Sequence, residues 1–141
     1  MVNPEIGKAG DIDTAITTLR YESGAIGAID NSRKAVYGYD QRIEVFGSEG
    51  MVAVSNKAPD KAVYSNSEGI HSSALLFFFI ERYADAYVAE MKEFVECIQR
   101  DKMPPVTGID GRIAVAMAYA AKKSYQENRP VKLGEVNDPT W

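Results

Sequence analysis

The hydrophobic pattern of the chain changes once, and this change constrains the fold more than any other feature. Over residues 12–80, short runs rich in β-branched residues are separated by glycine-containing turns, which is typical of β-strands. Over residues 81–128, apolar side chains recur every three or four positions, the period of one helical face. The sequence therefore predicts an α+β fold, with the strands first and the helices after them.

The strand region predicts two antiparallel hairpins and one further short strand. Glu22-Ser23-Gly24 supplies the first turn and Gly47-Ser48-Glu49-Gly50 the second, because glycine and small polar residues favour tight turns. Pro59 and Gly69 interrupt the polar stretch 56–73. The predicted strands are 13–21, 25–30, 42–46, 51–55 and a short one near 62–65.

Two long helices follow. The first covers about 80–98, and we expect Met103-Pro104-Pro105 to end it, because proline lacks the backbone N–H that a helix needs. The second begins at Thr107-Gly108-Ile109-Asp110, a start similar to a capping box. It runs to Tyr125 and stops at Asn128-Arg129-Pro130.

The predicted strands have few polar side chains on either face. One face of 13–21 carries Ala15, Thr17 and Leu19, and residues 51–54 have no polar side chain at all. An antiparallel sheet with one face in water alternates more clearly than this. We therefore expect a mostly antiparallel open sheet with both helices packed on one face and a subunit interface on the other. The alternative is a threonine-rich, mildly apolar face exposed to water.

Length and composition exclude several classes of protein. A chain of 141 residues fits a single domain, 1–141, and its net charge of −4 argues against nucleic-acid binding. Cys97 has no second cysteine to pair with, and the N-terminus shows no signal-peptide pattern. The longest apolar runs, 74–80 and 114–121, are far shorter than the roughly 20 residues that span a bilayer. We expect a cytoplasmic protein that does not enter a membrane.

Motifs of catalysis and cofactor binding are missing from the sequence. Its glycines form neither a dinucleotide fingerprint nor a phosphate-binding loop. His71 is expected in a solvated polar loop, and no nucleophile motif accompanies it. Cys97 is predicted to pack rather than react, because Glu93 and Glu96 disfavour its thiolate. A metal site lacks ligands, since this chain has one histidine and one cysteine.

The segment 31–42 is the best candidate for binding a ligand. Tyr37 and Tyr39 would point the same way if the backbone were extended, and Gly38 would allow a ligand or a backbone to approach closely. Two phenols, with Asn31 and Arg33 nearby, suit a neutral polyhydroxylated ligand, because each phenol offers a donor and an acceptor on a rigid ring. The alternative is an edge strand decorated with tyrosines beside a solvated charged loop.

The same segment resembles a known family. The runs Asn31-Ser32-Arg33 and 36–51, which reads VYGYDQRIEVFGSEGM, are similar to the C-terminal domain of inositol 2-dehydrogenases in the Gfo/Idh/MocA oxidoreductase family. Gly10-Asp11-Ile12-Asp13-Thr14-Ala15 and the helix opening 81–91 resemble it too, and the likeness extends to about Leu133.

The resemblance implies an NAD-dependent enzyme that oxidises myo-inositol or a related polyol to a keto sugar. It implies a separate N-terminal Rossmann domain for the nucleotide, and a C-terminal sheet that forms the back of the substrate pocket and the interface of a dimer or tetramer. Tyr37 and Tyr39 would contact the polyol, and Asp40 and Arg42 would brace their loop.

The family's dinucleotide fingerprint and catalytic residues lie upstream of what this sequence contains. We therefore expect the N-terminal Rossmann domain to be absent from this chain, which then binds no NAD and is inactive alone. The chain is either a piece of a longer enzyme or a natural short protein. The alternative function is a stand-alone polyol-binding or oligomer-forming interaction protein.

Overall fold

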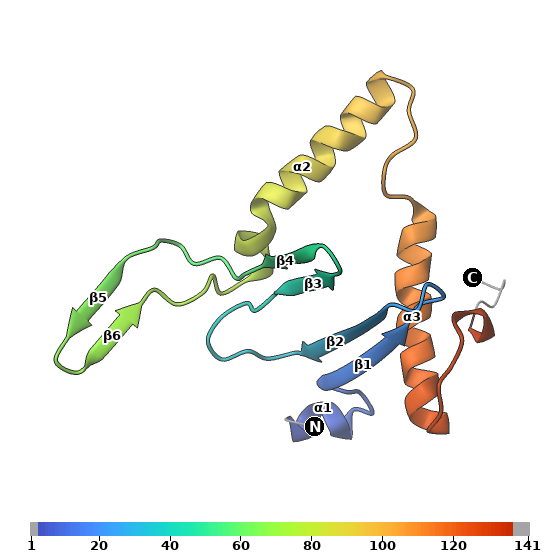
Figure 1. The fold of residues 1–141 in the computed structure, drawn as a ribbon, viewed down its shortest axis with the longest axis horizontal. Helices are drawn as coiled ribbons and strands as arrows, with labels where there is room; N and C mark the ends of the chain where they lie inside the picture. Colours follow the sequence, from blue (N-terminus) through green and yellow to red (C-terminus); the bar gives the residue numbers. More distant parts are fainter. Residues whose placement is uncertain (1–2, 137–141) are drawn as a thin grey trace. The chain divides into compact units, whose positions relative to one another are not determined.

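A computed structural model describes residues 3–136 of the chain (Figure 1). Within them the chain divides between Met91 and Lys92 into two compact units. In order, the elements are α1 (Pro4–Lys8), β1 (Thr14–Arg20), β2 (Ile26–Ser32), β3 (Ile43–Gly47), β4 (Gly50–Val54), β5 (Val63–Asn66), β6 (Gly69–Ser72), α2 (Phe79–Gln99), α3 (Gly108–Glu127) and the 3₁₀ turn η1 (Leu133–Glu135). The mixture of helices and antiparallel strands confirms the α+β class.

The β1–β2 hairpin follows the sequence prediction closely. Thr14 pairs with Ser32 at its open end and Arg20 with Ile26 at the turn, where Gly24 has φ +88°. Exposure alternates along β1, so that the face of Ala15, Thr17 and Leu19 is half-buried and the other face is exposed. The period-two pattern therefore identified the two faces of this strand.

The β3–β4 hairpin is the second predicted pair. Its register runs from Ile43↔Val54 to Gly47↔Gly50, with Ser48 and Glu49 in the turn. All residues of both strands are exposed, including Phe46 at 82% and Val52 at 68%. This hairpin thus presents apolar side chains that nothing in the described part of the chain covers.

The polar stretch 56–73 contains two strands, where the sequence predicted one. Val63–Asn66 is the predicted strand, and it pairs with Gly69–Ser72 through a tight turn in which the Asn66 side chain accepts from the backbone N–H of Glu68 at 2.9 Å. The prediction of a loop around His71 is therefore wrong. Pairing rather than local hydrophobicity makes β6 a strand, since its sequence GIHS has little strand character of its own.

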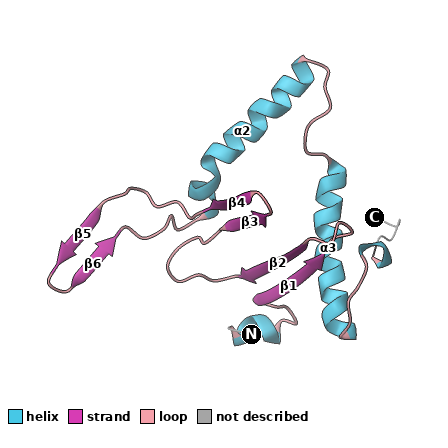
Figure 2. Cartoon of the chain, viewed as in Figure 1, coloured by secondary structure: helices cyan, strands magenta, loops and turns pink. Residues whose placement is uncertain are grey.

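The strands form three separate two-stranded ladders instead of one continuous open sheet (Figure 2). Some backbone N–H groups of the connecting segments bond to side chains, and others, such as that of Tyr39, bond to backbone carbonyls of another connecting segment. The N–H of Gln41 donates to the Asn56 side chain at 2.8 Å, and that of Ala62 to Asp60 at 2.8 Å. Since an isolated two-stranded hairpin is marginally stable in water, each ladder needs a further surface to pack against.

Helix α2 ends earlier than its prolines require. It stops at Gln99, and Asp101 adopts a left-handed conformation with φ +48°. The N–H of Lys102 then donates to the Cys97 carbonyl at 2.9 Å, which satisfies a carbonyl at the end of the helix as a Schellman motif does. The expectation that Met103-Pro104-Pro105 ends this helix is therefore corrected: the backbone closes the helix before the prolines are reached.

Helix α3 begins and ends where the sequence predicted. Its capping box between Thr107 and Asp110 is complete, and the Asp110 side chain accepts from the N–H of Thr107 at 2.7 Å. The Thr107 hydroxyl also accepts from the N–H of Ile109 at 3.2 Å. At the other end Asn128 takes a left-handed conformation with φ +51°. Asparagine tolerates that conformation better than most residues, which explains the stop.

The buried apolar side chains among residues 3–136 are small. They are Cys97, Ala116 and Ala120, and the Cys97 thiol donates to the Met103 carbonyl at 3.7 Å. Cys97 is therefore a packing residue, as the sequence indicated. No helix in the described range is both long and apolar enough to cross a bilayer.

Candidate functional site

The segment between β2 and β3, residues 33–42, is not extended. Val36 and Tyr37 lie in a turn, and Gly38 has φ +121°. The argument that Tyr37 and Tyr39 share a face, which required an extended backbone, therefore does not apply. Their positions are fixed by individual contacts instead.

Gly38 is buried where two backbones meet. A Cβ at this position would lie 2.8 Å from the Leu75 Cβ and 2.9 Å from the Leu75 carbonyl oxygen. Beside it, the N–H of Tyr39 donates to the Leu76 carbonyl at 2.8 Å. The predicted close approach at Gly38 thus exists, and the partner is the backbone at Leu75.

Asp40 is the centre of a hydrogen-bond network. Its carboxylate accepts from the Tyr37 hydroxyl at 2.5 Å and from the Asn56 side chain at 2.6 Å. Arg42 donates to both carboxylate oxygens, with Nε at 2.8 Å from Oδ1 and a terminal nitrogen at 3.0 Å from Oδ2. The Asp40 side chain is only 14% exposed, so these three donors fix its orientation.

The network keeps Asp40 charged and Tyr37 neutral. The guanidinium of Arg42, followed by the hydroxyl of Tyr37 and the amide of Asn56, lowers the pKa of Asp40 from 3.8 to about 2. The hydrogen bond to that carboxylate raises the pKa of the Tyr37 phenol. At neutral pH a carboxylate therefore faces a protonated phenol.

Three tyrosine rings, those of Tyr39, Tyr83 and Tyr87, pack in a row beside this network. Tyr39 packs edge-on against Tyr83 of α2 with 5.6 Å between ring centres, and Tyr83 packs in the same way against Tyr87 at 6.4 Å. The Tyr83 hydroxyl donates to the side chain of Gln41. Burial, followed by a hydrogen bond with Tyr39, raises the pKa of the Tyr83 phenol. Tyr39 is thereby held by the helix as well as by its own loop.

Sequence reasoning missed Asn56 and Tyr83 as partners of this loop. Asn56 follows β4, and Tyr83 lies on the apolar face of α2, where its spacing indicates a core residue. No local pattern marks either residue as a partner of the 33–42 segment, because both contacts join positions distant in sequence.

Arg33 lies in a different environment from the two tyrosines. Its guanidinium pairs with Asp11 at 3.2 Å, and its N–H donates to the Asp13 carbonyl at 2.8 Å. Asn31 is an exposed β2 residue paired with Ala15. The structure therefore brings Tyr37 and Tyr39 into one braced segment, and no described contact joins either of them to Asn31 or Arg33.

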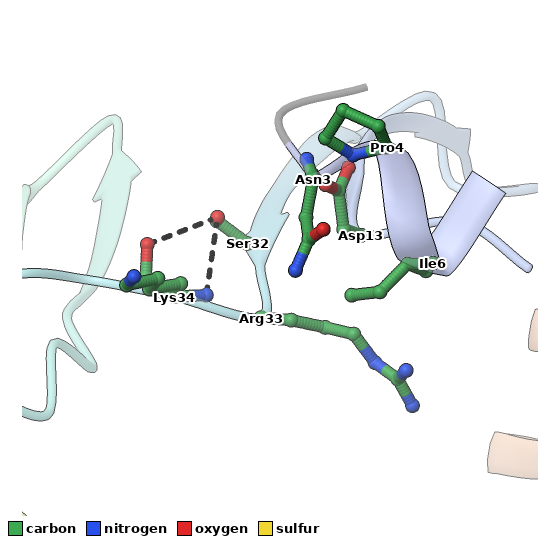
Figure 3. A pocket seen from close by; sticks show the side chains of 7 residues that line it. All are labelled: Asn3, Pro4, Ile6, Asp13, Ser32, Arg33 and Lys34. Atoms are coloured by element: carbon green, nitrogen blue, oxygen red, sulfur yellow. Dashed lines mark hydrogen bonds between the residues drawn. The ribbon is translucent and has the colours of Figure 1, made fainter. Parts of the chain in front are cut away.

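A pocket of about 360 Å³ lies beside Arg33 (Figure 3). Its volume is at the lower end of the range of small-molecule sites. Asp13 is buried, and its carboxylate accepts from the backbone N–H of Asn3 at the edge of this pocket. The lining residues are Asn3, Pro4, Ile6, Asp13, Ser32, Arg33 and Lys34. Apolar and polar groups thus line it together.

The described residues contain no βαβ motif of the kind that binds a dinucleotide. Every strand pair among residues 3–136 is antiparallel, whereas the dinucleotide motif needs a parallel βαβ unit. The left-handed glycines Gly24, Gly50 and Gly69 lie at hairpin turns rather than before a helix. Over the same range, no cluster of three histidine, cysteine or carboxylate side chains could hold a metal ion. We derive no chemical step through either group.

Comparison with known proteins decides the family. Residues 2–133 match the model of the C-terminal alpha/beta domain of the GFO/IDH/MocA oxidoreductase family. The chain belongs to this family. It is 52% identical to the myo-inositol 2-dehydrogenase of Thermotoga maritima over 96% of its own length and 41% of that protein's length.

Solved structures agree with this family. The crystal structure of a 'probable dehydrogenase' from Thermotoga maritima matches this chain with a TM-score of 0.92 and 52% identity. The match covers 96% of this chain and 41% of the Thermotoga chain. A scyllo-inositol dehydrogenase from Lactobacillus casei, solved with bound NAD(H) and scyllo-inositol, matches 95% of this chain and 39% of that one, with a TM-score of 0.85 and 25% identity. The chain therefore spans about two-fifths of the length of these relatives.

Proposed function

We propose that this chain is the C-terminal substrate-pocket and oligomerisation domain of an NAD-dependent, inositol 2-dehydrogenase-like oxidoreductase. Its substrate is myo-inositol or a related polyol, which the whole enzyme oxidises to a keto sugar. The observation that carries this proposal is the 52% identity to a myo-inositol 2-dehydrogenase across almost the whole chain. The scyllo-inositol dehydrogenase solved with NAD(H) supports the cofactor.

Within this domain, Tyr37 and Tyr39 contact the polyol, with Asn31 and Arg33 as further substrate residues. The braced geometry of the loop supports the tyrosines, because rigid phenols can bind hydroxyl groups without losing much side-chain entropy. The pocket beside Arg33 supports the role of that residue, since its polar and apolar lining suits the edges and the flat face of a cyclic polyol.

The apolar side chains of the hairpins support oligomerisation. Phe46 of β3 and Met51 of β4 pair across the hairpin, so they share a face, and both are more than half exposed. A large contiguous apolar surface usually marks a contact with another protein surface. In the proposed enzyme this hairpin face packs against a second subunit, as a dimer or tetramer. The nucleotide is held by a separate N-terminal Rossmann domain.

The chain alone is expected to be inactive, because hydride transfer needs a bound nucleotide and a general base positioned at the substrate. The test is to incubate the purified 141-residue chain with NAD and myo-inositol and to follow NADH by its absorbance. No NADH above the protein-free control is expected. Formation of NADH in proportion to the protein concentration would contradict this part of the proposal.

The substrate role is tested in a chimera. The part of the Thermotoga maritima enzyme that this chain does not match is joined to the chain, and NADH formation with myo-inositol is measured. Tyr39→Phe should raise KM or lower kcat about tenfold, the effect of losing one hydrogen bond to a substrate. Tyr125→Phe, which alters an exposed phenol on α3, is the control and should change neither. Unchanged constants for Tyr39→Phe would remove Tyr39 from the site.

A further inference from the structure

The Tyr37 hydroxyl has a single proton, and the structure shows where that proton goes. The hydroxyl donates to Asp40 Oδ2 at 2.5 Å. A phenol has one donor and also lone pairs that can accept. With its proton engaged by the carboxylate, the Tyr37 oxygen is left as an acceptor, and Tyr37 as a whole is 53% exposed.

Asp40 cannot easily turn away from Tyr37. Arg42 binds both carboxylate oxygens, and Asn56 holds Oδ1 at 2.6 Å. The Asn56 amide is itself oriented, because its oxygen accepts from the N–H of Gln41 at 2.8 Å. A two-point contact from a guanidinium fixes the plane of a carboxylate as well as its position. The direction of the Tyr37 proton is therefore set by residues before β3 and after β4.

We propose that Asp40 is a positioning residue that holds Tyr37 as a hydrogen-bond acceptor, so that Tyr37 binds a hydroxyl group of the polyol that donates to it. This inference rests on the proposed function and adds the direction of the hydrogen bond: the polyol donates and Tyr37 accepts. Tyr37 then favours a ligand with a hydroxyl at that position over one with a carbonyl, because a carbonyl has no proton to donate. A site that hydrogen-bonds a substrate hydroxyl discriminates strongly against analogues that lack it.

The first test measures the Tyr37 phenol itself. The full chain carrying ¹³C-labelled tyrosine is titrated with base and followed by NMR, as wild type and as Asp40→Asn. Replacing the carboxylate by a neutral amide should lower the pKa of Tyr37, because the charged acceptor that holds the proton is gone. Asp60→Asn removes a carboxylate that binds Ser73 instead and is the matched control. If the pKa of the Tyr37 phenol were the same in Asp40→Asn as in wild type, the positioning role of Asp40 would be overturned.

The second test measures the ligand. Calorimetric titration with myo-inositol should show about tenfold weaker binding for Tyr37→Phe and for Asp40→Asn, and no further loss in the double variant. Additive losses would overturn the proposal, because they would mean that Asp40 does not act through Tyr37. Binding that Tyr37→Phe weakens and Asp40→Asn leaves intact would overturn it as well.

A third variant protects the test against misfolding. Arg42→Lys keeps the charge beside Asp40 but removes the two-point contact. It should lower the pKa of the Tyr37 phenol and weaken the binding of myo-inositol, as Asp40→Asn does, but by smaller amounts. Absence of both effects would overturn the role of the network. Failure of wild type to bind myo-inositol would overturn the ligand part of this inference and polyol binding by the chain alone, whereas the titration of Tyr37 tests its coupling to Asp40 separately.

Discussion

Gly38 and Leu75 lie so close that a single methyl group at Gly38 would be 2.8 Å from the Leu75 Cβ. Gly38 also has φ +121°, a conformation that side chains with a Cβ rarely adopt. The segment 33–42, which carries Tyr37 and Tyr39, thereby contacts the segment before α2 at a point where only glycine fits. The position of Tyr37 and Tyr39 depends on this contact.

Gly38→Ala should therefore destabilise the chain. Both the left-handed backbone and the contact with Leu75 oppose a Cβ, and we expect the free energy of unfolding in urea to fall by about 1–3 kcal/mol. Gly111→Ala is the matched control, because that glycine lies within α3 and an added Cβ meets no atom within 4 Å. The control should be neutral or stabilising by up to about 1 kcal/mol. Equal stability of the two variants would contradict the tight contact at Gly38.

The capping box of α3 gives a second prediction. Thr107→Ala removes the hydroxyl that accepts from the N–H of Ile109, so the free energy of unfolding should fall by about 0.5–2 kcal/mol. Thr107→Ser keeps that hydroxyl and should retain most of the stability. Helix content by circular dichroism and urea midpoints would measure both variants. A midpoint for Thr107→Ala that equals wild type would show that the cap contributes little.

The ion pair between Arg129 and Glu135 should make the free energy of unfolding depend on pH. Arg129, followed by the N–H of Lys132, lowers the pKa of Glu135 from 4.5 to about 2, and Glu127 and Lys123 are the other charged groups nearby. Because the folded value lies below the unfolded one, the stabilisation is complete above about pH 4.5 and is lost as the pH falls towards 2. The stability difference between wild type and Glu135→Gln should shrink over that interval. A difference that stays constant from pH 6 to 2 would contradict the ion pair.

The sequence allowed most of the elements to be predicted, because their signals are local. A run rich in β-branched residues located β1, and period-three-and-four spacing located α2. The capping box at Thr107 and Asp110 could be read directly, since both partners lie within one turn. The α+β class followed from the order of these signals along the chain.

The elements that the sequence did not predict depend on partners or on backbone geometry. β6 is a strand because it pairs with β5, and α2 ends at Gln99 because Asp101 turns left-handed. The short helix α1 was missed although Asn3 caps it, since five residues give no periodic pattern. The separation of the strands into three ladders was also not predicted, because no local pattern specifies which strands pair.

The candidate site was predictable only in part. Tyr37 and Tyr39 could be selected from residue type, and the resemblance added Asp40 and Arg42 as bracing residues. The contacts of Asp40 with Asn56 and of Tyr39 with Tyr83 join positions far apart in the sequence, and no local pattern specifies them. Those contacts turn a polar loop into a rigid one.

The most direct test of the account is to locate myo-inositol on the full chain. All eight tyrosines are labelled with ¹³C, assigned by single substitutions to phenylalanine, and observed by NMR as myo-inositol is added. We expect saturable shifts at Tyr37 and Tyr39, with Tyr64 and Tyr125 unchanged. Shifts absent from Tyr37 and Tyr39 while another tyrosine responds, or no response at any of the eight, would contradict a polyol site at this loop.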